Sequence, residues 1–180
     1  TAVNNGVIKV AAADSIPSAA TVAGSTGWLV LDGGTTSGML DIIGFDLTVN
    51  ALSGLGGTVV GVITNSSSVA ATNRITVLNA ASTTYNGLIA DNTAGAKTAL
   101  FITGPNTLTL KPPNYNTFSG GIVVSNSSLA FGNAQNESLY SPGTGSITLL
   151  GTNASLYLAG SGGSTGPTYA GLTNDVTLPA

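Results

Sequence analysis

The chain has 180 residues, of which only 6% are charged, against a usual share of about 25%, and its formal net charge is −3. Four basic residues offer a nucleic-acid backbone almost nothing to bind, and the absence of histidine and cysteine excludes Ser–His–Asp triads, zinc–thiolate sites and disulfides. A hydrophobic share of 42% with a low net charge argues against disorder, and the length fits one domain.

Short alternating or β-branched runs recur along the whole chain, and no stretch of a dozen residues keeps the i, i+3, i+4 spacing of a helix. The alanine cluster at 11–13 is too short for a helix and is soon followed by Pro17. The sequence therefore predicts about twelve short strands. In chain order they are Val7–Val10, Trp28–Leu31, Leu47–Val49, Thr58–Ile63, Arg74–Leu78, Ala99–Ile102, Thr107–Leu110, Gly121–Val124, Ser128–Phe131, Ser146–Leu150, Ser155–Leu158 and Asp175–Leu178.

Pairs of asparagine and glycine separate these runs, as at Asn86-Gly87 and Gly120-Gly121. Such residues reach positive φ at low cost, so each pair predicts a corner of the chain. Asn-Gly also suits a two-residue hairpin turn, which makes an antiparallel arrangement the structural alternative. The uniform strand length favours a coil.

An internal repetition supports the coil. The segment at roughly 5–33, which opens NGVIKVAAA, returns in outline at roughly 126–160, which opens NSSLAFGNA. A chain that begins a second copy of its own pattern is typical of a solenoid, where each coil buries its apolar edge against its neighbours. We therefore expect residues 1–180 to form a single β-solenoid domain.

Several segments resemble the autotransporter-associated β-strand repeat family: LDIIGFDLTVNALSGLGGTV from Leu40, TYNGLIADN from Thr84, TGPNTLTL from Thr103, and NTFSGGIVVSNSSL from Asn116. The correspondence covers most of the chain. The resemblance implies an all-β fold, a single-stranded right-handed parallel β-helix of short strands. It also implies a place on the bacterial cell surface, as in autotransporter passengers and large secreted repeat proteins.

The stretch from Asn106 to Gly132 shows how one coil would be built. The leucines of Thr107–Leu110 would face inward and its threonines outward, because strand side chains alternate. Tyr115 and Phe118 would cap the next corner. Gly120 and Gly121 would let the backbone turn where a side chain would clash with the coil above. This stretch is a scaffold and not a site.

The carboxylates do not suggest catalysis. The acidic residues stand singly, at Asp14, Asp32, Asp41, Asp46, Asp91, Glu137 and Asp175. Asp41 and Asp46 are the closest pair, and we interpret them as flanking a solvated corner around Gly44, in preference to the paired acids of a glycoside hydrolase. They are also too sparse for a calcium site, and no lysine lies in a Ser–Lys motif. We expect no enzyme activity, cofactor or metal.

Aromatic side chains leave one binding function open. Trp28, Tyr85, Tyr115, Tyr140, Tyr157 and Tyr169 could stack on sugars if they shared a face, although such residues are more often core or corner residues. Glycans of a host or neighbouring cell are therefore a minor candidate partner. No apolar run approaches the roughly 20 residues of a membrane helix, so we expect no membrane insertion.

Two functions from different classes remain. In the first, the chain is an extracellular structural subunit whose main partner is itself, assembling by strand or coil-edge pairing into a filament or matrix, because unpaired edge strands template further pairing. The residues expected at those edges are Val7, Ile8, Val10, Val176 and Leu178. In the second, it is a stalk segment of a monomeric autotransporter-like adhesin. Either would be secreted, with any signal peptide absent from this chain.

Overall fold

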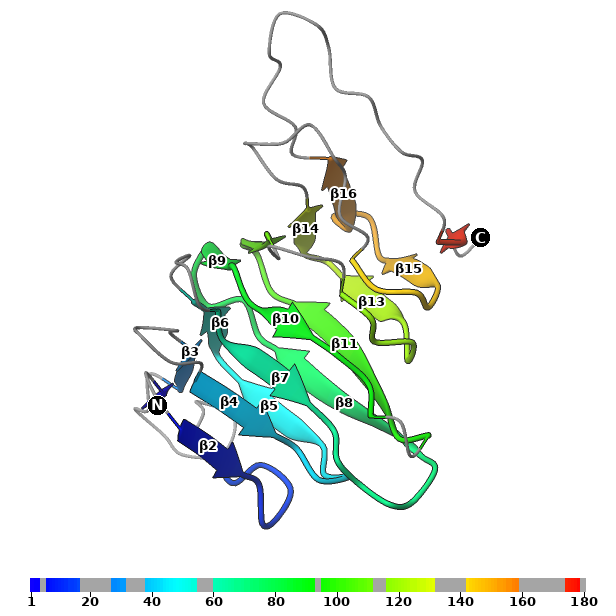
Figure 1. Ribbon diagram of the computed structural model, residues 1–180. Coiled ribbons are helices and arrows are strands. Elements are labelled where there is room, and N and C mark those ends of the chain that lie inside the picture. The colour runs from blue at the N-terminus through cyan, green and yellow to red at the C-terminus, as the bar shows by residue number, and fades with distance from the viewer. Residues whose placement is uncertain are drawn as a thin grey trace, which may run out of the picture.

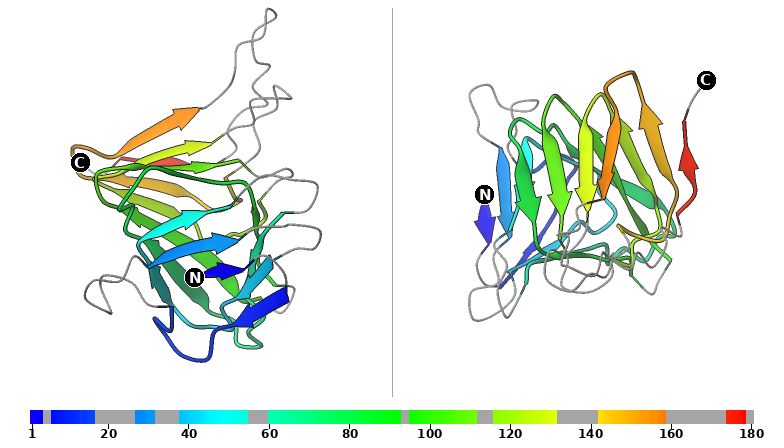
Figure 2. Two further views of the ribbon diagram at one scale, coloured as in Figure 1. Left: turned by 90° about the vertical axis from the view of Figure 1, so that its left-hand side faces the viewer. Right: turned by 90° about the horizontal axis from the view of Figure 1, so that it is seen from above.

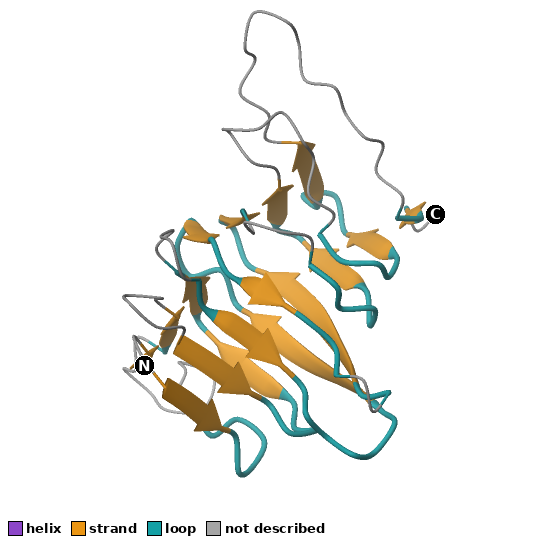
Figure 3. Cartoon of the chain, viewed as in Figure 1, coloured by secondary structure: helices purple, strands orange, loops and turns teal. Residues whose placement is uncertain are grey.

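The computed structural model describes residues 1–3, 6–16, 27–31, 38–54, 60–92, 95–111, 116–131, 142–158 and 174–178. These residues form strands and loops and contain no helix, and therefore none able to span a membrane (Figures 1 and 3). Every strand pairing among them is parallel. The chain is a parallel β-solenoid, which confirms the expected fold class and excludes the antiparallel alternative.

The strands are short throughout. In chain order they are β1 (Ala2–Val3), β2 (Gly6–Lys9), β3 (Trp28–Leu31), β4 (Gly38–Asp41), β5 (Leu47–Val49), β6 (Ala51–Ser53), β7 (Val62–Thr64), β8 (Thr72–Val77), β9 (Thr83–Tyr85), β10 (Leu88–Ile89), β11 (Lys97–Thr103), β12 (Thr107–Leu110), β13 (Ile122–Ser125), β14 (Ser128–Phe131), β15 (Ile147–Leu150), β16 (Ser155–Leu158) and β17 (Val176–Thr177).

The strands stack into the faces of a prism. Sheet A has the order β1-β3-β6 and sheet D the order β9-β12-β14-β16. A bridge between Gly54 and Tyr85 joins these two sheets into one face, called here the A/D face. Sheet B has the order β2-β4-β7-β10 and sheet C the order β5-β8-β11-β13-β15-β17. Figure 2 shows the strands side by side, from the blue N-terminal end to the orange and red C-terminal end.

The core consists of apolar rows that run along the stack. The register of sheet C aligns one residue per coil, in the order Leu47, Ile75, Leu100, Ile122 and Ile147. All of them are buried. Burying a side chain of this size contributes about 1.5–3 kcal/mol, so the rows are the main source of stability. The outward row of the same sheet mixes polar and apolar residues, in the order Thr48, Thr76, Phe101, Val123 and Thr148.

Most predicted strands are confirmed, and five of them have the predicted bounds, as at Trp28–Leu31 and Ser155–Leu158. Sequence reasoning missed β1, β4, β6, β9 and β10. These strands have two to four residues, and none of them alternates between apolar and polar residues. Part of the predicted strand at 58–63 lies outside the described residues.

The segment around β12 matches its predicted design in most respects. The leucines of β12 are buried and its threonines half-buried. A Cβ on Gly120 would lie 2.4 Å from the Thr98 carbonyl oxygen of the previous coil, and Gly121 has a φ of +86°. Phe118 lies between β12 and β13, and its side chain is fully buried in the core. Tyr115 lies outside the described residues.

Tyr85 fills a slot made by glycines of its own and the preceding coil. Cβ atoms added to Gly54 and Gly87 would lie 3.2 Å and 2.3 Å from its ring atoms. Its hydroxyl donates to the Gly61 carbonyl oxygen at 3.1 Å. Burial raises the pKa of Tyr85 well above its ordinary value of 10.0, because the phenolate would lose its hydration. Tyr85 is therefore a core residue and is unable to stack on a sugar.

Candidate functional site

The two ends of the solenoid carry the candidate assembly edges. β1 and β2 are the first strands of the A/D face and of sheet B, and β16 and β17 are the last strands of the A/D face and of sheet C. Within the described part of the chain, no strand pairs with the outer side of any of these four. Each therefore presents unpaired backbone N–H and C=O groups, which in general promote pairing with another strand.

The predicted N-terminal assembly residues differ in exposure. Val7 points outward from β2 and is 55% exposed, and Ile8 is half-buried against the core. Val10 follows β2 and is only 2% exposed. Its N–H donates to the Asp41 carbonyl oxygen at 2.9 Å, which continues the ladder between the first two coils. Val10 is thus a core residue, and of the three only Val7 offers a largely free side chain.

The predicted C-terminal residues are the ends of core rows. Val176 pairs with Ile147 and so extends the inner row of sheet C, but it is 43% exposed because no described strand covers it. Leu178 lies just beyond β17 and is 71% exposed. The structure places these residues at the opposite end of the stack from Val7. They form two separate edges and not a single site.

Sequence reasoning missed the edges of the A/D face. β1 has only two residues, and Ser155–Leu158 was predicted as a strand but not as an edge. Tyr157 points outward from β16 and is 55% exposed, and Trp28 on β3 is 40% exposed. The two aromatic residues lie on the same face but in its last and second strands, so they do not form one sugar-stacking platform. Tyr140 and Tyr169 lie outside the described residues.

The two carboxylates of the closest acidic pair hold separate corners of the chain. Asp41 is buried, and its carboxylate accepts hydrogen bonds from the Ser66 N–H at 2.9 Å and the Ser66 hydroxyl at 2.5 Å. Asp46 is exposed and accepts from the Arg74 N–H at 2.8 Å. The predicted solvated corner around Gly44 therefore fits Asp46 but is wrong for Asp41. The two hydrogen bonds from Ser66 compensate the Asp41 carboxylate for the hydration that it loses on burial.

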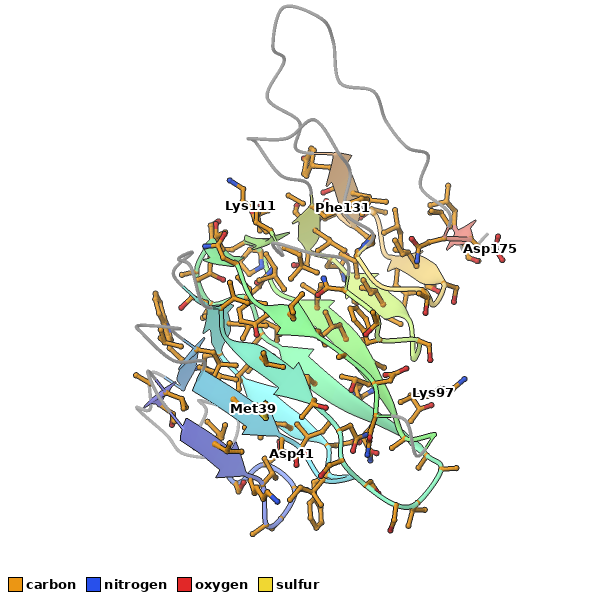
Figure 4. All side chains as sticks on the ribbon, in the orientation of Figure 1. Met39, Asp41, Lys97, Lys111, Phe131 and Asp175 are labelled. Carbon is orange, nitrogen blue, oxygen red and sulfur yellow. The ribbon has the colours of Figure 1, made fainter. Side chains whose placement is uncertain are left out.

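The remaining acids are also dispersed. Asp91 accepts from the N–H groups of Thr98 at 2.7 Å and Ser119 at 2.8 Å. In the described ranges, no three Asp, Glu, His or Cys side chains gather closely enough to hold a metal ion. Asp32 and Glu137 lie outside those ranges. Lys97 and Lys111 point away from the body of the solenoid (Figure 4).

Buried amides tie the coils together without charge. Asn79 is fully buried, and its side-chain nitrogen donates to the Asn106 carbonyl oxygen at 2.9 Å and to the Ser127 hydroxyl at 2.7 Å. The side-chain nitrogen of Asn106 donates back to the Asn79 carbonyl oxygen at 2.7 Å. This group, called here the asparagine clamp, joins three successive coils at the corner between sheet C and the A/D face. Sequence reasoning did not single it out.

The two halves of the predicted internal repeat lie on different faces. Its first strand is β2 in sheet B, whereas the corresponding β14 lies in sheet D.

Comparison of the chain with protein-family models, with curated proteins and with solved structures found no match. The case for a function therefore rests on the coil edges and the surface chemistry.

Proposed function

We propose that this chain is a non-enzymatic structural subunit that assembles with copies of itself into an extracellular filament or matrix, by coil-edge pairing. The observation that carries the proposal is that the apolar core rows reach the C-terminal end of the described stack and finish there in exposed side chains, Val176 and Leu178. At the same end, the outer backbone groups of β16 and β17 pair with no strand among the described residues. Covering these groups with another coil buries apolar surface and pairs polar groups in one step.

The chemistry of the outer faces supports the same reading. Only 6% of the residues are charged, so little charge has to be desolvated when two copies meet. The two ends also differ from each other, since one exposes β1 and β2 and the other β16 and β17. A contact between unlike ends is heterologous, and it propagates into an open filament where its rotation does not close a ring.

The surface location is part of the proposal and rests on the resemblance to the autotransporter-associated β-strand repeat family. The stalk segment of a monomeric adhesin remains the alternative. In that case, further coils of a longer chain would cover the same edges.

Light scattering after size exclusion, together with negative-stain electron microscopy of the 180-residue chain, tests the proposal. We expect mass to grow with protein concentration and filaments to appear. The A/D face has three strands from sheet A and four from sheet D, so at about 4.8 Å per strand the axial repeat should be roughly 34 Å. Particles of monomer mass at every concentration would contradict assembly and favour the stalk.

A further inference from the structure

The first and last strands of the A/D face have complementary backbone edges. In a parallel pair, alternate residues direct both their N–H and C=O groups to the same neighbouring strand. Ala2 pairs with Val30, and the Val30 N–H donates to the Thr1 carbonyl oxygen at 2.9 Å. The bonds to β3 are therefore made by the residues flanking Ala2, and both backbone groups of Ala2 face away from the solenoid.

The same reasoning applies at the other end. Ser155 pairs with Ser128, and its N–H donates to the Ser127 carbonyl oxygen at 3.0 Å. Ser155 and, two residues on, Tyr157 thus direct their backbone groups toward β14. The groups of Leu156 and Leu158 point outward.

We propose that β16 of one copy pairs in parallel with β1 of the next, with Tyr157 opposite Ala2, so that the A/D face runs unbroken through the junction. The Ala2 N–H then donates to the Leu156 carbonyl oxygen of the other copy, and the Leu158 N–H donates to the Ala2 carbonyl oxygen. Every outward group of Ala2 finds a partner in this register. This inference rests on the proposed function and specifies its contact.

Side-chain positions agree with that register. Within the chain, an inner row of the A/D face passes through Val3, Leu31, Gly54, Tyr85, Leu110 and Phe131. Phe131 pairs with Leu158, so Val3 of the next copy would take the following place in the same row. On the outer side, the exposed ring of Tyr157 would lie beside the small side chain of Ala2. A large residue beside a small one packs without overlap.

Proline substitutions test the register at each edge. Ala2→Pro removes an N–H that bonds no other described residue of the chain, and proline is tolerated on edge strands. Its matched control is Ala2→Thr, which keeps the N–H. Leu158→Pro and Leu158→Ala form the corresponding pair at the other end. Far-UV circular dichroism and the urea midpoint show whether each variant retains the fold.

We expect each proline variant alone to need at least about a tenfold higher concentration for half-assembly than its control, because an unpaired backbone group is left in the junction. A mixture of the two proline variants should form a dimer and nothing larger, since the open β16 of Ala2→Pro fits the open β1 of Leu158→Pro. If the wild type and both proline variants assemble equally, this register is wrong while self-assembly stands. If the wild type stays monomeric, both proposals fail.

Discussion

Replacing Asn79 tests whether the asparagine clamp holds the coils together. The substitution Asn79→Ala removes two side-chain hydrogen bonds, to the Asn106 carbonyl oxygen and the Ser127 hydroxyl. Each contributes about 1 kcal/mol net. The side-chain oxygen of Asn79 has no hydrogen-bond partner, so its removal returns about 1 kcal/mol. The polar terms therefore sum to a modest loss of about 1 kcal/mol.

The backbone conformation of Asn79 adds a second contribution to the loss of unfolding free energy. Asn79 has a φ of +46°, a left-handed conformation that costs an alanine about 1–2 kcal/mol and a glycine almost nothing. We thus expect Asn79→Ala to lower the free energy of unfolding by about 2–3 kcal/mol and Asn79→Gly by about 1 kcal/mol. The difference between the two variants isolates the backbone term, because both lose the same side-chain contacts.

The assay is urea unfolding at neutral pH, followed by far-UV circular dichroism at a concentration where the protein is monomeric. Asn153→Ala, at an exposed corner, is the control and should stay within about 0.5 kcal/mol of the wild type. The reasoning is refuted if Asn79→Gly is as destabilising as Asn79→Ala. It is also refuted if Asn79→Ala matches the control.

Three further predictions concern named corners, and all are measured by the same unfolding assay. Gly87→Ala should lower the free energy of unfolding by about 3 kcal/mol or more, because the new Cβ would lie 2.3 Å from the Tyr85 hydroxyl oxygen and 2.4 Å from the Gly61 carbonyl oxygen. A loss below about 1 kcal/mol would mean that the glycines do not enclose the Tyr85 ring tightly. Asp41→Ala should lower the free energy of unfolding by about 2–3 kcal/mol, because buried charge-assisted hydrogen bonds are lost, whereas Asp46→Ala, at an exposed residue, should lower it by less than about 1 kcal/mol. Equal losses would contradict the different roles of the buried and the exposed aspartate. Above pH 10, the unfolded chain releases the Tyr85 proton that the folded chain retains. The free energy of unfolding of the wild type should therefore fall by about 1.4 kcal/mol per pH unit relative to that of Tyr85→Phe. Parallel dependence of the two unfolding free energies on pH would contradict this.

Periodicity predicted those parts of the fold that depend on a single strand. Thr107–Leu110 alternates clearly, and its burial alternates in the same way. In contrast, β4 ends in a buried aspartate, which reads as a surface residue in the sequence. Its serine partner, Ser66, lies 25 residues further along the chain. The environment of Asp41 is set by the next coil, and no local pattern reveals it.

The candidate edge residues also differ in whether the local sequence or the neighbouring coil determines their exposure. The exposure of Val7, Val176 and Leu178 follows from their positions in or beside the first and last described strands, where no described coil packs on them. Val10 is similar in sequence but is covered by its own neighbouring coil. The repeated strand patterns did not identify the face, because all faces require the same inward and outward alternation. β2 and β14 resemble each other for this reason while lying in different sheets.

Lys9 makes the two faces of the N-terminal end unequal. It is an exposed residue of the edge strand β2, whereas Ala2 and Val3 of β1 have no charged side chain. A lysine on an edge strand commonly opposes further pairing, because its charge would have to be desolvated. Growth is then least opposed along the A/D face.

We therefore expect Lys9→Ala to lower the concentration for half-assembly several-fold, as measured by sedimentation. Lys97→Ala is the control, because Lys97 is exposed and lies on β11 within sheet C, away from both ends. A higher concentration for Lys9→Ala would mean that Lys9 binds the next copy, and Asp175, just before β17 at the opposite end, would be the acid to test as its partner. A change of the half-assembly concentration in either direction would mean that sheet B is part of the junction. No change would place the whole contact on the other faces.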